Sequence, residues 1–94
     1  MIRIVWAAVA RRDLAAHIDY IARDDPDAAD RVEEAILAAV DGLAAFPFRG
    51  RPGRRSGTRE LAVAAFPTYI VVYTASESQV GIARLLHSRQ AWPR

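Results

Sequence analysis

A basic segment rich in glycine and proline, residues 46–61, separates two halves of this chain that differ in expected secondary structure. It reads FPFRGRPGRRSGTREL and contains five arginines, three glycines and two prolines. Proline lacks the amide donor that a helix interior needs, and glycine is a frequent residue of turns, so this composition excludes a regular helix. We expect an exposed basic loop that leads into a strand beginning near Thr58.

The residues before this segment predict a strand followed by a helix. Apolar residues alternate with others over residues 2–6, which is typical of a short strand with one buried face. Residues 9–23 repeat apolar side chains three and four positions apart, which predicts an amphipathic helix. Its buried stripe comprises Leu14, His17, Ile18 and Ile21. We interpret His17 as a core-edge histidine that hydrogen-bonds to backbone rather than as a catalytic group.

A second helix is predicted from Pro26 to about Ala45. Proline at the first helical position loses no hydrogen bond, and the aspartate before it can cap the free amides of the first turn. Gly42 weakens the last turns and Pro47 ends them. The connection between the helices is short, so they should fold back as an antiparallel hairpin. The predicted buried stripe of the second helix is Ala29, Val32, Ile36, Val40 and Leu43.

Three strands are predicted after the loop. The first spans residues 58–66 and ends at Pro67, and the last spans residues 80–87. Between them, residues 68–74 are β-branched or aromatic throughout, which predicts a central strand covered on both faces. The whole chain, residues 1–94, is therefore expected to form one α+β domain of the order βααβββ: an antiparallel sheet with the antiparallel helical hairpin packed on one face.

The helical hairpin can cover only one face of such a sheet. The continuous apolar strand should then leave hydrophobic surface on the other face or along an edge. Exposed apolar patches of this kind usually mark a binding surface. The chain is therefore expected to be an interaction protein.

Charge is distributed unevenly along the chain. Residues 1–41 contain five arginines and nine acidic residues, whereas residues 42–94 contain eight arginines and two acidic residues. A one-sided basic surface favours an anionic partner, either an acidic protein segment or a nucleic acid. The acidic residues of the first half follow helix-start positions and solvent-facing spacing, so they do not predict a metal or acid–base site.

Several classes of protein are excluded by the composition. The chain has no cysteine, which removes disulfides, thiolate metal sites and cysteine nucleophiles. It has no apolar run near the roughly 20 residues of a membrane helix. We expect a cytoplasmic protein with no cofactor, no metal and no membrane partner. The glycines of the basic segment lie between a helix and a strand, the reverse of the order found in phosphate-binding loops.

Four motifs in order along the chain resemble the ParE branch of the RelE/ParE toxin superfamily. They are the opening Ile4-Val5-Trp6 with its alanine-rich helix, the pattern GRPGRxxGTREL at residues 50–61, the run YIVVY at residues 69–73, and LLHSRQAWP at residues 85–93. Phe46-Pro47 at the end of the second helix fits the same family. The family fold has the element order predicted above.

The resemblance implies a toxin of a bacterial type II toxin–antitoxin module, of the kind associated with plasmid stabilisation and growth inhibition. Its partners would be a ParD-like antitoxin, which wraps the toxin with an acidic or amphipathic tail, and DNA gyrase as the target. Direct sequence-specific DNA binding is not expected. The residues expected to contact partners are Arg49, Arg51, Arg54, Arg59, Tyr69, Tyr73, Arg84, His87, Arg89 and Trp92.

Two activities compete within this superfamily. RelE-like members cut messenger RNA on the ribosome, and they carry an arginine within the central strand, where this chain has Ile70. Isoleucine can neither donate a proton nor pair with a phosphate, which favours the gyrase-directed activity. The alternative, a ribosome-dependent endoribonuclease, would require Arg84, His87 and Arg89 to converge in one basic cleft. A third reading is a non-toxic remnant or a nucleic-acid-binding module that uses the basic loop.

Overall fold

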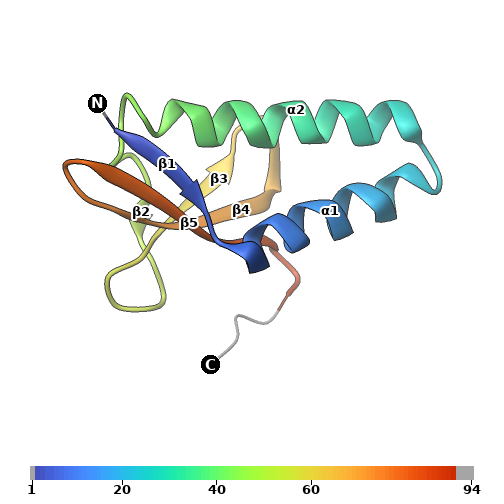
Figure 1. Cartoon of the computed structure of the whole chain (residues 1–94). Helices are drawn as coiled ribbons and strands as arrows, with labels where there is room; N and C mark the ends of the chain where they lie inside the picture. Colours follow the sequence, from blue (N-terminus) through green and yellow to red (C-terminus); the bar gives the residue numbers. More distant parts are fainter. Residues whose placement is uncertain (1, 91–94) are drawn as a thin grey trace.

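The computed structural model describes residues 2–90 as two helices and five strands (Figure 1). The order of strand, helix, helix and strands agrees with the α+β arrangement predicted from the sequence. One strand is additional, because two residues of the basic segment pair with the strand that follows. The elements are β1 (Arg3–Trp6), α1 (Ala8–Ala22), α2 (Pro26–Gly42), β2 (Arg51–Pro52), β3 (Arg59–Val63), β4 (Phe66–Ala75) and β5 (Gln79–His87).

The five strands form one mixed sheet in the order β1-β5-β4-β3-β2. Its middle strand is β4, as predicted. β1 runs parallel to β5, with Arg3 opposite Gln79 and Trp6 opposite Ile82, and the other neighbouring strands are antiparallel. The prediction of a wholly antiparallel sheet was therefore wrong for β1. Side-chain alternation reports which face of a strand is buried, but not the direction of the strand beside it.

The helices form an antiparallel hairpin over one face of the sheet (Figure 1). α2 begins as predicted: Pro26 occupies its first turn, and the Ala28 amide donates to the Asp25 carboxylate at 3.0 Å. α2 ends at Gly42, before the predicted Ala45. From Leu43 to Ala45 each amide donates to the carbonyl three residues back, so the chain continues as a tighter turn.

The core lies between the hairpin and the sheet. The predicted buried stripe of α2 is confirmed, since each of its five residues is buried. The apolar side chains of the predicted α1 stripe are half-buried and pack against the same core. The sheet contributes buried residues from its three central strands: Val63, Val71, Tyr73, Val80, Ile82 and Leu85.

The other face of the sheet is less open than the sequence suggested. Val72 on β4 and Leu86 on β5 are both buried, although neither belongs to the core under the helices. The large apolar side chains that are exposed within residues 2–90 come from other places. Two of them, Phe46 and Phe48, lie in the loop after α2. The apolar surface expected on the other face or along an edge is therefore small: Ile70 of β4 is half-buried, and Val5 of the edge strand β1 is exposed.

Pro67 does not end a strand. The turn between β3 and β4 is made by Ala64 and Ala65, and Pro67 is the second residue of β4. The register between these strands shifts at Ala62 and Val63, so that Pro67 has no partner on β3. Proline is tolerated at such an irregularity because the bulge removes the need for its missing amide donor.

Candidate functional site

The basic loop folds around one buried acid, Glu60. Only 4% of this residue is exposed. Its Oε2 accepts hydrogen bonds from the Arg54 backbone amide at 2.9 Å and from Arg54 Nε at 3.3 Å. Its Oε1 lies 3.7 Å from Arg51 Nη2 and has no hydrogen-bond partner within residues 2–90. The carboxylate therefore anchors the loop from inside and orients two of its arginines.

Opposing effects determine the protonation of this carboxyl. Burial alone would raise the pKa of Glu60, because a low-polarity environment disfavours the charged form. The backbone and side-chain hydrogen bonds from Arg54, together with the charges of Arg54 and Arg51, outweigh burial and hold the pKa of Glu60 below its usual value. The group is thus a carboxylate at neutral pH.

Two arginines lie over aromatic rings beside this anchor. The guanidinium of Arg49 lies 5.2 Å from the centre of the Phe46 ring, and that of Arg59 lies 5.1 Å from the centre of the Phe48 ring. Arg59 is also fixed by its backbone contacts: Nη1 donates to the carbonyl of Gly50 at 2.7 Å and to that of Phe48 at 3.2 Å. These arginines are therefore pre-oriented on the surface.

Tyr73 lies in the core and not on a partner surface. Its side chain is fully buried, and its hydroxyl accepts a hydrogen bond from the Gly50 amide at 2.8 Å. A partner docking on this surface cannot touch the ring, so the expectation of a partner contact at Tyr73 was wrong. Its role is to hold the start of the loop. A Cβ at Gly50 would lie 2.7 Å from the same hydroxyl, which explains why this position needs glycine.

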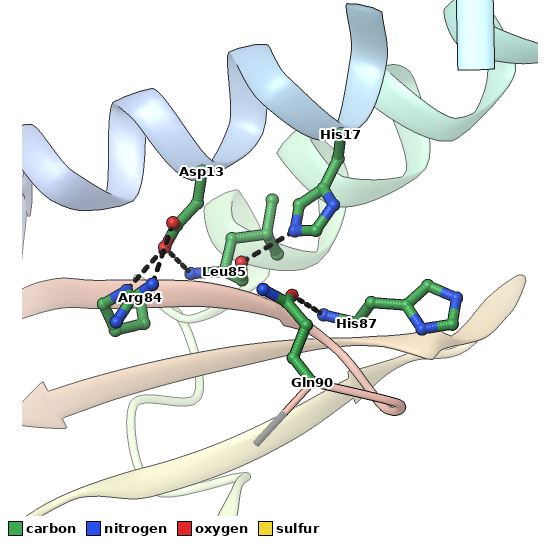
Figure 2. Close-up of polar contacts among 6 residues, drawn as sticks. All are labelled: Asp13, His17, Arg84, Leu85, His87 and Gln90. Atoms are coloured by element: carbon green, nitrogen blue, oxygen red, sulfur yellow. Dashed lines mark hydrogen bonds and ion pairs between the residues drawn. The ribbon is translucent and has the colours of Figure 1, made fainter. Parts of the chain in front are cut away.

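Asp13 and His17, one turn apart on α1, satisfy both backbone groups of Leu85 on β5 (Figure 2). The Leu85 amide donates to Asp13 Oδ2 at 2.9 Å, and His17 Nε2 donates to the Leu85 carbonyl at 3.0 Å. β1 pairs with β5 only as far as Ile82. The two side chains therefore take the place of a neighbouring strand at this open edge. The structural interpretation of His17 is confirmed.

Arg84 forms an ion pair with the carboxylate of Asp13 (Figure 2). Its Nε and Nη2 donate to the two oxygens of Asp13 at 2.7 and 3.1 Å, a bidentate ion pair that is largely shielded from solvent. The hydrogen bond to Asp13, opposed by burial, raises the pKa of Arg84 above its already high value. Arg84 thus helps to hold α1 against the sheet.

A cavity of about 510 Å³ lies between the end of α1 and the end of β5. At its centre the Tyr69 ring meets His17 and His87 edge-on, each with its ring centre 5.3 Å away. Burial raises the pKa of the Tyr69 hydroxyl. Arg89 also lines the cavity, together with two acidic residues, Asp24 and Asp25. The cavity is therefore mixed in charge rather than uniformly basic.

His87 is fixed by the turn that follows β5. Its Nδ1 accepts a hydrogen bond from the Arg89 amide at 3.2 Å, and its own amide donates to Gln90 Oε1 at 2.6 Å (Figure 2). The neutral ring therefore carries its proton on Nε2.

The endoribonuclease alternative requires Arg84, His87 and Arg89 to converge, and the structure brings only two of them together. His87 and Arg89 share the cavity, whereas Arg84 does not line it. Trp92, the remaining partner-contact candidate, lies outside the described residues. Within residues 2–90, no group of histidine, aspartate and glutamate side chains is arranged to hold a metal ion, and neither helix could cross a membrane.

An apolar groove that was not predicted from the sequence lies between α2 and β3. It has a volume of about 530 Å³, and Arg49 lies at its rim. Its floor consists of small side chains: Ala35, Ala38 and Ala39 of α2 with Ala62, Ala64 and Ala65. The sequence does contain a sign of this groove: alanines lie beside the buried stripe of α2. Asp13 was missed because its partners Arg84 and Leu85 lie far away in the sequence. Glu60 was missed because its arginine partners are close in the sequence but reach it only through the way the loop folds.

Comparison with known proteins agrees with this architecture. Residues 4–92 match the family described as the ParE toxin of the type II toxin–antitoxin system parDE. The chain belongs to the ParE toxin family. It thereby falls in the RelE/ParE superfamily, and membership in a type II toxin–antitoxin family implies an antitoxin partner.

Similar proteins support this assignment along almost the whole chain. It is 48% identical over 92 residues to Y4kP of Sinorhizobium fredii, a match that covers 98% of this chain and 94% of that protein. It is 38% identical over 88 residues to the toxin RelE2 of Caulobacter vibrioides, covering 94% and 97% of the two chains.

Solved structures share the fold. A chain of the chromosomal ParDE system from P. aeruginosa superposes with a TM-score of 0.81 at 23% identity, covering 93% of this chain and 96% of that one. A histidine-to-glutamine variant of YafQ from E. coli gives a TM-score of 0.61 at 14% identity, with 93% of each chain covered.

Proposed function

We propose that this ParE-family toxin inhibits DNA gyrase by binding, without covalent chemistry of its own, and acts in the cytoplasm, where gyrase works. The observation that carries the proposal is the apolar side chain on the central strand, Ile70, which lines an open recess whose arginines, Arg49 and Arg51, come from the basic loop and not from the strand. Ile70 lies there between Ala62 and Leu86, where the nuclease branch carries an arginine. Arg84 is paired with Asp13. Phosphate-directed chemistry would need free basic groups at this point.

The partner that neutralises the toxin is proposed to be a ParD-like antitoxin with an acidic or amphipathic tail. The groove between α2 and β3 offers an alanine-lined floor for apolar side chains, and Arg49 at its rim offers a charge for carboxylates. Arg51 lies next to this region on β2 and has a largely exposed side chain. A helix that lays its apolar face in the groove would satisfy both features.

A gyrase assay with the purified chain tests the proposal. We expect loss of DNA supercoiling and accumulation of cleaved DNA, both reversed by the protein encoded next to this toxin. A matched variant, Arg49→Gln, should weaken the reversal by the antitoxin, because it removes the rim charge. Unimpaired supercoiling at toxin concentrations that stop growth would refute the gyrase target.

The alternative, a ribosome-dependent endoribonuclease, is favoured by one observation: His87 and Arg89 line the same cavity as Tyr69. It predicts messenger RNA cleavage during translation that is lost in His87→Gln and Arg89→Gln. Under the gyrase proposal, neither substitution produces or removes cleavage, because the wild-type chain cuts no RNA. Primer extension on translated messages separates the two activities.

A further inference from the structure

Phe46 and Phe48 are large apolar residues that the core does not use. They are 60% and 54% exposed, on either side of Pro47 in the loop after α2. An open recess of about 370 Å³ lies at this point, lined by both rings and by Arg49. Two exposed aromatic side chains beside one open recess form an apolar patch of the kind that marks an interaction site.

Planar cationic groups lie against these rings. Arg49 lies over Phe46 and Arg59 over Phe48, so each ring has a guanidinium near one face. The carbonyls of Phe48 and Gly50 hold the Arg59 guanidinium in place. The ring surface that remains exposed is available for a further planar group.

The surroundings of the rings are cationic. Arg51 and Arg54 follow within the same loop, and their side chains are 76% and 50% exposed. The acid beside them, Glu60, is buried and already bonded to Arg54. A ligand that approaches Phe46 and Phe48 from solvent therefore meets aromatic surface and positive charge together.

We propose that the surface formed by Phe46, Phe48, Arg49, Arg51 and Arg59 binds single-stranded nucleic acid, with unpaired bases stacked on the rings and phosphates paired with the arginines. Stacking is open to any base, since every base has an aromatic face, so the binding is not sequence-specific. An acidic peptide would use the arginines but leave the rings without a matching group. The inference goes beyond gyrase inhibition and does not depend on it.

Fluorescence anisotropy with labelled 12-nucleotide strands of deoxyuridine and of uridine, which differ only in the sugar, tests this proposal. A hairpin duplex and a polyglutamate peptide of equal charge serve as competing ligands. We expect both single strands to bind more tightly than the duplex and the peptide. A difference between the two single strands would support the proposal and show that the sugar is also read.

Variants distinguish the contribution of ring stacking to binding from the contribution of the arginine charges. The double substitution Phe46→Leu and Phe48→Leu keeps apolar surface but removes the rings, and should weaken binding about tenfold or more. Phe46→Tyr with Phe48→Tyr keeps the rings and should retain the affinity. Arg51→Gln should lower the salt slope by about 0.7, the contribution of one phosphate on a single strand. Tyr20→Leu, near the opposite end of the helical hairpin, is the matched control.

Three results would overturn the proposal. The leucine variant could bind the strands as tightly as the wild type while its circular dichroism is unchanged. The duplex could bind as tightly as the single strands, which would leave charge alone as the cause. The polyglutamate peptide could bind while both strands do not, which would assign the surface to an acidic protein.

Discussion

Glu60 shows how one buried residue organises a surface loop. Its carboxylate accepts the Arg54 amide and side chain and lies near Arg51. Replacing it by glutamine keeps the shape and removes the charge, so Glu60→Gln should lower the free energy of unfolding by about 1–2 kcal/mol at pH 7. Urea denaturation measures this loss. Glu77→Gln, on an exposed turn, is the control and should change it by less than about 0.5 kcal/mol.

The pH dependence of that loss follows from the pKa of Glu60, which is lower in the folded chain than its usual value. The stabilisation is complete above the pKa of the unfolded carboxyl and disappears as the pH falls through the lowered folded value. The difference between wild type and Glu60→Gln should therefore shrink as the pH falls from 7 towards 3. If this difference in the free energy of unfolding stayed constant with pH, the ionised carboxylate of Glu60 would not be its cause.

The buried hydroxyl of Tyr73 leads to a second prediction about a single residue. Tyr73→Phe removes only the hydroxyl, which leaves the buried Gly50 amide without its acceptor. We expect a loss of about 1–3 kcal/mol in the free energy of unfolding, measured in urea. Tyr20→Phe, at a side chain exposed to solvent, should have almost no effect. Equal stability of Tyr73→Phe and wild type would show that this hydrogen bond is not needed.

Among the elements, α1 depends on Asp13 for its attachment to β5. Asp13→Ala leaves the Leu85 amide without its side-chain acceptor and breaks the ion pair of Arg84. The expected cost is about 2–4 kcal/mol, measured by urea denaturation. Asp19→Ala, on the exposed side of the same helix, is the matched control. A cost below about 0.5 kcal/mol would show that the contacts of Asp13 with Leu85 and Arg84 do not stabilise the fold.

At the level of helices and strands, the features that depend on local sequence pattern were predicted correctly. The stripe of α2, the start at Pro26 and the central position of β4 all follow from spacing and side-chain type, and the structure has them. The cover on both faces of β4 is confirmed only for residues 71–73. The parallel direction of β1, the short β2 and the link from Asp13 to Leu85 depend on segments far apart in the chain. No local pattern encodes such pairings.

For the molecule as a whole, the family was predictable from four motifs in order, and the comparison confirmed it. The site was predictable only in part. The arginines of the loop were identified by composition, but their orientation is set by Glu60, Phe46 and Phe48, whose positions required the fold. Tyr73 was misplaced because an aromatic residue on a central strand can point to either face.

The pairing of β1 with β5 has a consequence for synthesis of the chain. Residues 3–6 bond to residues 79–82, so β1 has no partner until more than 70 further residues have been added. Such distant pairing slows folding, because a long loop must close first. A chain interrupted before residue 79 lacks β5 altogether and leaves both β1 and β4 without their neighbour. Products that stop before residue 79 therefore cannot form the sheet described above.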